Sequence, residues 1–277
     1  MKMKAIIISV VLLSAIVITS FYMYNHMEIE LTLVTTHGET RHKISNADKA
    51  VNLRNREIVK IEGLEKLHNL TELNLNQNHI TDLNWLPKLK KLKKLYLDDN
   101  KIRVLHKSDF DKIPEITRLW VAHNNLNGLE DINVLKKLED LDLGYNQLTK
   151  IDIQGTMLMV TRLNLSGNKL SKVSGLENVP NVSQLWLSNC EIAKIEGLEH
   201  LRKLASLDLS YNLITEVENL KDLQFLDYLN LSDNKINHIN PAELPKSIET
   251  INITDNNIPE AEINRIKDVL GKVTIHY

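Results

Sequence analysis

The sequence predicts an α/β solenoid of about ten stacked turns, and three observations point to it. The phrase L-x-x-L-x-L-x-x-N-x-I, seen in residues 204–214, recurs along most of the chain. Successive copies are 22 residues apart, except for one step of 24. A second apolar series follows each phrase at intervals of three residues. One copy cannot bury its leucines alone, so a fixed period of this length indicates turns that stack into one continuous core.

Within each phrase, two leucines alternate with polar residues, which is the pattern of a short strand with one buried face. The residue that then turns the chain is nearly always asparagine. A buried asparagine must satisfy its amide, and in a stacked coil it can do so against backbone groups of its own and the neighbouring turn. The sequence therefore predicts a structural ladder at Asn78, Asn100, Asn124, Asn146, Asn168, Cys190, Asn212, Asn234 and Asn256.

Cys190 stands at an asparagine position and has two interpretations. It is either a reactive thiol or a small buried residue tolerated in the ladder. A reactive thiol needs a basic or histidine neighbour, and none is recognisable nearby in the sequence. We therefore expect a structural residue.

The apolar series after each ladder residue suits a short helical or 3-10 return segment that packs on the strand. The solenoid is expected over residues 48–258, with a degenerate first copy around Val51 and Leu53. Between Asn100 and Asn124 the period is longer by two residues, and such insertions bulge on the return side. One elongated domain follows, although 277 residues are enough for two ordinary ones.

Residues 1–24 are expected to form a membrane anchor or a signal peptide. Residues 5–24 carry no charge, and a helix of that length spans roughly 30 Å, enough for a bilayer core. Lys2 and Lys4 precede this run and no Lys or Arg follows before Arg41, so the repeats are expected on the extracytoplasmic side. Cleavage after a small residue such as Ser20 would instead give a secreted or periplasmic protein. The lack of an A-x-A motif favours the uncleaved anchor.

The ends of a solenoid need covers, and both flanks of the repeats suit that role. Residues 25–47 alternate around Gly38 and predict an N-terminal β-hairpin cap. Residues 259–277 predict a C-terminal helix–strand cap, because Pro259 opens an amphipathic stretch that ends at Gly271 before a final alternating run.

Composition narrows the function. Lys and Arg number 34 against 36 Asp and Glu, which gives no argument for a nucleic-acid partner. The basic run in residues 88–94 is interpreted as a solvated face, because its leucines are core positions. His37 and His42 have no further ligands nearby, so neither a metal nor a cofactor is expected. No nucleotide-binding, metalloprotease or hydrolase motif is present, which argues against an enzyme.

Residues 58–67 and 192–204 share the pattern I-x-x-I-E-G-L-E-x-L and resemble the 22-residue subclass of leucine-rich repeats. That subclass includes the regulatory subunit of type 1 protein phosphatase and the bacterial internalins. The resemblance covers the predicted solenoid. It implies a curved, right-handed coil with a parallel sheet on its concave side, used to bind another protein. The phosphatase regulators are intracellular, and the apolar N-terminus argues against that role here.

Side chains that flank the buried leucines point to the face opposite the core. Two of the three tryptophans lie at the middle of this face, three turns and thus roughly 14 Å apart. Trp, Tyr and Arg carry much of the binding energy at protein interfaces. The predicted partner-binding residues are Tyr96, Arg118, Trp120, Asp140, Asp142, Tyr145, Arg162, Trp186, Asp208, Tyr211 and Tyr228.

We expect a non-enzymatic, monomeric protein-binding scaffold outside the cytoplasm. The alternatives are an intracellular scaffold like the phosphatase regulators and a secreted lipid- or glycan-binding module. The same face would be merely solubilising if its aromatic residues were incidental. The pair Asp140 and Asp142 resembles an acid–base pair, but a single-layer coil is not expected to form a pocket around it.

Overall fold

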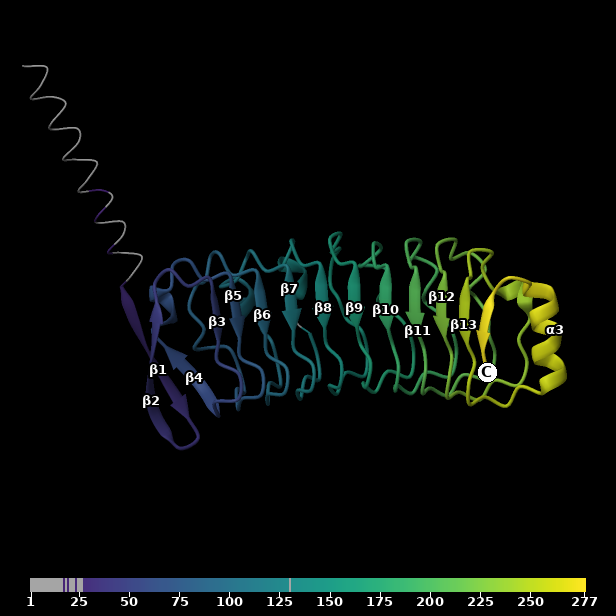
Figure 1. Cartoon of the computed structure of the whole chain (residues 1–277), viewed down its shortest axis with the longest axis horizontal. Coiled ribbons are helices and arrows are strands. Elements are labelled where there is room, and N and C mark those ends of the chain that lie inside the picture. The colour runs from purple at the N-terminus through teal and green to yellow at the C-terminus, as the bar shows by residue number, and fades with distance from the viewer. Residues whose placement is uncertain (1–16, 18, 20–22, 24–26, 130) are drawn as a thin grey trace, which may run out of the picture.

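In the computed structural model, the described residues are 17, 19, 23, 27–129 and 131–277. They form an elongated solenoid in which each turn adds one strand to an 11-stranded parallel sheet (Figure 1). In chain order the sheet strands are β3 (Ala50–Asn52), β5 (Glu72–Asn74), β6 (Lys94–Tyr96), β7 (Arg118–Trp120), β8 (Asp140–Asp142), β9 (Arg162–Asn164), β10 (Gln184–Trp186), β11 (Ser206–Asp208), β12 (Tyr228–Asn230), β13 (Thr250–Asn252) and β14 (Thr274–His276).

The strands pair in strict register, with leucine beside leucine from turn to turn. Leu185 of β10 lies opposite Leu163 of β9 and Leu207 of β11. These middle residues are buried, and so is the apolar residue just after each strand, such as Leu209. Two apolar side chains per strand therefore pack into one core, which runs the length of the coil between the sheet and the return segments.

The ladder amides bond to backbone groups of two successive turns. Asn212 donates to Leu187 O of the preceding turn at 2.8 Å and to Leu209 O of its own turn at 3.0 Å, and it accepts from Ile192 N at 3.1 Å. The other asparagines repeat this pattern. Cys190 is buried, and its Sγ lies 3.6 Å from Leu165 O. Burial raises the pKa of this thiol, which keeps it in the unreactive form.

The return segments are only partly helical. Short 3-10 helices occur at η1 (Leu64–Lys66), η2 (Ile132–Val134) and η3 (Pro241–Glu243). Most other turns contain successive hydrogen bonds of 3-10 type, such as Leu201 N to Leu198 O at 2.9 Å and Leu204 N to Leu201 O at 3.0 Å. The short helical or 3-10 return segments expected from the sequence are therefore present, as 3-10 helices at η1, η2 and η3 and as 3-10 turns in most of the other repeats, and the chain then extends into the next strand.

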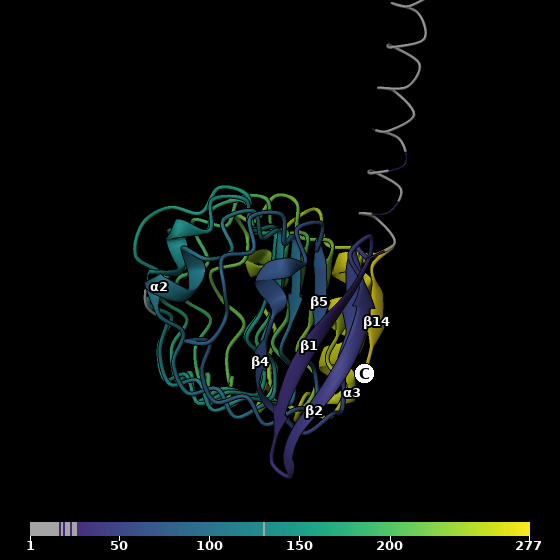
Figure 2. The ribbon, with the colours of Figure 1, turned by 90° about the vertical axis from the view of Figure 1, so that its left-hand side faces the viewer.

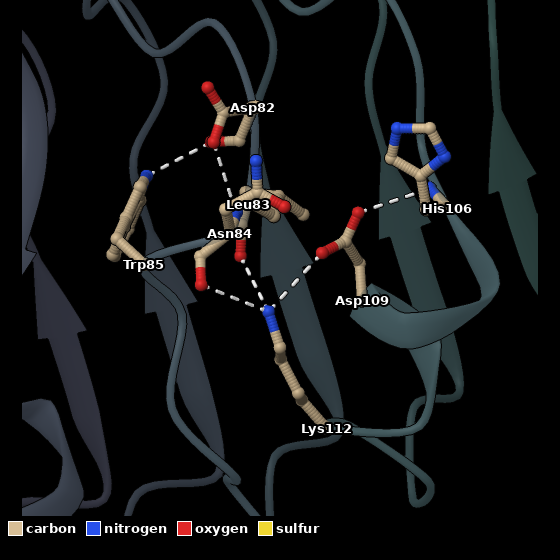
Figure 3. A network of polar contacts seen from close by, with 7 residues as sticks. All are labelled: Asp82, Leu83, Asn84, Trp85, His106, Asp109 and Lys112. Carbon is tan, nitrogen blue, oxygen red and sulfur yellow. Dashed lines mark hydrogen bonds and ion pairs between the residues drawn. The ribbon is translucent and has the colours of Figure 1, made fainter.

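The two extra residues between Asn100 and Asn124 are accommodated by a short helix, α2 (Lys107–Phe110), which lies on the side of the coil away from the sheet (Figure 2). Asp109 at its centre is almost fully buried and accepts from His106 N at 3.0 Å. Lys112 Nζ reaches Asp109 Oδ1 at 3.3 Å and the carbonyl of Leu83 in the preceding turn at 2.9 Å (Figure 3). This contact ties the insertion to the preceding turn.

Each end of the coil carries the elements expected there. β1 (Glu28–Thr35) and β2 (Gly38–Ser45) form an antiparallel hairpin that crosses the end of the solenoid (Figure 2). β1 also pairs with β4 (Ile58–Glu62) from the first return segment, which the sequence analysis did not anticipate. At the other end, α3 (Glu260–Leu270) covers the last turn, and β14 extends the parallel sheet.

The expected anchor or signal segment, residues 5–24, falls outside the described residues except for positions 17, 19 and 23. Within the described part, no helix has the length and apolarity needed to cross a bilayer.

Candidate binding face

The sheet face is the side of the parallel sheet turned away from the core. Three columns of side chains make it up. The first column holds the first residue of each strand, and the central column holds the third residue. The outer column holds the residue two positions after the third, such as Ser166 after Asn164. Of the predicted binding residues, Arg118, Asp140, Arg162 and Tyr228 lie in the first column, and Tyr96, Trp120, Asp142, Trp186 and Asp208 lie in the central column.

Tyr145 and Tyr211 lie beside the outer column, at the position just before the ladder residue. This position has a left-handed backbone in every repeat, with φ of 52° at Tyr145 and 53° at Tyr211. Such a conformation costs a residue other than glycine about 1–2 kcal/mol. The two side chains are nevertheless large and exposed, at 45% and 60% of their area.

Aromatic side chains cluster around the centre of the face. The rings of Tyr96 and Trp120 meet edge to face with centroids 4.9 Å apart. The rings of His123 and Tyr145 stack at 4.4 Å with an angle of 5° between their planes. The other side of the Tyr145 ring lies against Gly167, where a Cβ atom would come within 2.5 Å of Tyr145 Cδ1. Glycine at 167 therefore leaves the space that the tyrosine ring occupies.

Most central-column residues are Asn or Asp because they end the strand. Their Oδ1 atom accepts from the backbone N–H two residues later, which forms an Asx turn. The distances are 2.9 Å from Asp142 to Gly144 N and from Asp208 to Ser210 N, and 3.0 Å from Asn164 to Ser166 N. Asn74, Asn230 and Asn252 make the same bond. Asp142 and Asp208 thus have a structural role in addition to their predicted binding role.

Tyr96, Trp120 and Trp186 break this pattern, because an aromatic ring offers the backbone no acceptor. In each case a side chain of the preceding turn supplies it. The backbone N–H groups concerned lie in the outer column, two residues after each aromatic residue. Asp98 N donates to Asn76 Oδ1 at 2.8 Å, Ala122 N donates to Asp98 Oδ1 at 2.9 Å, and Ser188 N donates to Ser166 Oγ at 3.2 Å. The sequence therefore carries one compensating acceptor for each aromatic residue that it places in the central column.

A hollow of about 480 Å³ opens on the sheet face between the two tryptophans. Its outermost lining strands, β7 and β10, carry Trp120 and Trp186. Ser166 and Ser188 of the outer column also line it, and these small side chains leave the space open. The remaining lining residues are Asp140, Asp142, Tyr145, Arg162, Asn164 and Gln184. The expectation that this face would form no pocket was wrong, because large central-column side chains stand beside small outer-column ones.

The charges of the hollow are unevenly balanced. Asp140 is buried, and its Oδ2 pairs with Arg162 Nη2 at 2.7 Å. Asp142 has no ion pair with a basic side chain in the described ranges, and burial raises its pKa. Asp98, on the outer column beside Trp120, has its pKa raised to about 6, first by burial and further by the charge of Asp142.

The structure brings Trp120, Asp140, Asp142, Tyr145, Arg162 and Trp186 together around the hollow. Tyr96 joins them through its contact with Trp120, whereas Asp208, Tyr211 and Tyr228 belong to later turns and do not line it. The predicted binding residues do not include Asn164, Ser166, Gln184 and Ser188, which line the hollow, or Asp98 beside Trp120. The outer column could have been found by following the two-residue alternation one step past the second leucine.

Trp120 has one further feature: its indole N–H is buried and has no hydrogen-bond partner among the described residues. Buried indole N–H groups usually have one. Within the same residues, no group of three or more His, Cys, Asp or Glu side chains is placed to hold a metal ion. What the hollow offers is therefore aromatic area, hydrogen-bonding amides and hydroxyls, and one lining carboxylate, that of Asp142, without a basic partner among the described residues.

Three family models match the chain. One described as "Leucine rich repeat" matches residues 68–126, one described as "Leucine Rich repeats (2 copies)" matches residues 159–200 and 180–222, and one described as "Leucine Rich Repeat" matches residues 225–246. A comparison with curated protein sequences found no match.

Several solved structures share the fold. The functional domain of InlJ from Listeria monocytogenes, which includes a cysteine ladder, is 25% identical with a TM-score of 0.65; the match covers 84% of this chain and 50% of that one. This chain thus matches half the length of the InlJ chain. The mouse RP105/MD-1 complex is 25% identical with a TM-score of 0.64, and the match covers 76% of this chain and 39% of that one. YopM, an effector protein from Yersinia pestis, is 23% identical with a TM-score of 0.60, and the match covers 77% of this chain and 57% of that one.

Proposed function

The chain belongs to the leucine-rich repeat proteins, and from this premise we propose that it is a non-enzymatic scaffold that binds another protein on its sheet face. Proteins of this fold are typically non-catalytic, and a structure similar to this one is the mouse RP105/MD-1 complex. We take the sheet to be the concave side of a right-handed coil, as the family resemblance implies.

The observation that carries the proposal is the compensated placement of three aromatic residues. In most turns an Asn or Asp side chain of the central column accepts from the outer-column N–H. Tyr96, Trp120 and Trp186 occupy that column without providing such an acceptor. The lost acceptor is restored from the neighbouring turn, so the aromatic residues are not needed for the strand to end. Large aromatic side chains on a solvent-facing column, next to a hollow, are the usual anchors of a protein interface.

Site-specific photo-crosslinking of the full chain in its native cells tests this proposal. A photoreactive phenylalanine analogue at Gln184, which is exposed beside Trp186, is expected to give a covalent adduct with one discrete protein. The matched control is the same analogue at Lys172, which is exposed on the return side of a neighbouring turn. Equal adducts at both positions, or adducts only at Lys172, would contradict a sheet-face scaffold.

We further propose that the sheet face works outside the cytoplasm and that residues 5–24 anchor the chain in a membrane. The support is the charge-free run and the Lys and Arg asymmetry around it. With a C-terminal tag, the full-length chain is expected in the membrane fraction, and protease added to intact cells is expected to digest the repeats. N-terminal sequencing that starts near Phe21 would indicate a cleaved signal instead. A soluble, protected, full-length chain would reverse the proposed location.

A further inference from the structure

We infer that the hollow between Trp120 and Trp186 receives an arginine side chain of the partner protein, which pairs with Asp142 and stacks on tryptophan. This inference rests on the proposed function, because it identifies the chemistry by which the sheet face would recognise its partner. Three features of the hollow lead to it: the available carboxylate, the aromatic walls and the space between them.

Asp142 is the carboxylate available to a cation. The other acid in the lining, Asp140, is already paired with Arg162 at 2.7 Å. Asp142 accepts from Gly144 N at 2.9 Å and from the side-chain amide of Asn164, and no basic side chain in the described part of the chain forms an ion pair with it. A half-buried carboxylate that is not neutralised is costly to the free protein, and an incoming cation would relieve that cost.

The aromatic walls favour arginine over lysine. A guanidinium is planar, is weakly hydrated, binds a carboxylate through two parallel N–H groups and stacks on aromatic faces. Both kinds of contact are offered here, by Asp142 in the lining and by the Trp120 and Trp186 side chains on the bounding strands. An ammonium group would use only the charge.

The size of the hollow indicates that the arginine arrives on a loop. The volume is about 480 Å³, and three strand spacings of about 4.8 Å separate the tryptophans. That span is wider than one side chain needs. Asn164, Gln184 and Ser188 add amide and hydroxyl groups to the lining, which suits the backbone on either side of an inserted arginine.

Indole signals in a nitrogen-15 spectrum of the full chain, labelled at tryptophan, test this inference. The probe is the blocked peptide acetyl-Gly-Gly-Arg-Gly-Gly-amide, compared with the same peptide carrying citrulline, the neutral counterpart of arginine, or glutamate. Arginine is expected to shift the Trp120 and Trp186 signals. The Trp85 signal is the internal reference, because that indole donates to Asp82 O at 2.9 Å on the return side and is expected not to move.

The citrulline peptide is expected to bind about tenfold more weakly than the arginine peptide, which corresponds to the loss of one charge-assisted hydrogen bond. Asp142→Asn is expected to weaken arginine binding by a similar factor. Asparagine is the natural central-column residue at 164 and 230, where it ends the strand in the same way, so folding is retained. The control is Asp255→Asn, which removes one charge far along the same face and is expected to leave arginine binding unchanged.

Equal binding of the arginine, citrulline and glutamate peptides, or an Asp142→Asn variant that binds arginine as well as the wild type, would overturn the inference. So would an absence of shifts at Trp120 and Trp186. If the Gln184 crosslink still formed in that case, the sheet face would remain a protein-binding face with a different chemistry. Arginine binding in the hollow together with a crosslink confined to Lys172 would reject the proposed function and keep the arginine site.

Discussion

At the scale of single residues, the sheet face is organised by the acceptor that each backbone N–H of the outer column finds. Asx side chains supply it in most turns, as Asn164 does for Ser166 N. Next to an aromatic residue the acceptor comes from the preceding turn, as Ser166 Oγ does for Ser188 N. Binding residues and structural residues are therefore coupled in pairs one turn apart, and this coupling can be measured.

Ser166→Ala is expected to destabilise the wild-type chain by about 1–2 kcal/mol, because the N–H of Ser188 loses its acceptor. In a Trp186→Asn background the same substitution is expected to cost about a third of that or less, since the new asparagine supplies its own acceptor. A double-mutant cycle by urea unfolding checks this. Equal costs in both backgrounds would show that the two positions are not coupled.

Asp98 provides a pH-dependent signature of the face. Its pKa is raised to about 6, first by burial and then by the Asp142 charge, against hydrogen bonds from Ala122 and Asn76. Because the folded chain holds this proton at a pH where the unfolded chain has released it, the site favours folding more as the pH falls from 6 to 4. Carbon-13 titration of the carboxyl is expected to give a midpoint near 6, and Asp142→Asn is expected to lower it. A midpoint near the ordinary value of 3.8 would contradict this picture.

At the scale of elements, a turn is defined by where its corners close. Gly197 stands at a corner with φ of 73°, and a Cβ atom there would collide with the backbone carbonyl of Val173 in the preceding turn. Substitution by alanine is thus excluded by close stacking as well as by conformation. The one lengthened turn is held differently, by a polar network around α2 (Figure 3).

Lys112→Met is expected to destabilise the chain by about 3 kcal/mol. It leaves the buried Asp109 carboxylate without its cation and removes the Lys112 hydrogen bond to the carbonyl oxygen of Leu83, which still accepts from Leu86 N at 3.0 Å. Urea unfolding of the variant measures the loss. Combining it with Asp109→Asn is expected to recover part of the stability, because the uncompensated charge is removed. A loss below about 0.5 kcal/mol, typical of a surface ion pair, would mean that the network does not hold the insertion.

At the scale of the whole molecule, the period of the sequence predicts the fold because every turn repeats one packing problem. The alternating leucines predict the sheet, and the asparagine positions predict the ladder that Asn212 and its equivalents form. The pairing of β1 with β4 was not predicted, since it joins residues outside the repeat to a return segment.

The candidate site was predictable only in part. Alternation places Trp120 and Trp186 on one face, but the hollow between them depends on small outer-column residues such as Ser166 and Ser188. The compensating acceptors come from positions about one repeat away, so they cannot be recognised within a single copy. The face on which a side chain lies follows from the pattern within one strand. The depth of the hollow and the hydrogen bonds of the sheet face depend on residues of neighbouring turns.

The affinity of the crosslinked partner for a Trp120→Asn, Trp186→Asn double variant tests the central claim most directly. Asparagine is the commonest residue in this column, so thermal unfolding is expected to stay within a few degrees of the wild type. Loss of two aromatic anchors is expected to weaken binding at least about 100-fold. Unchanged affinity would contradict a binding role for the sheet face, and collapse of the thermal transition would show that the two tryptophans are structural.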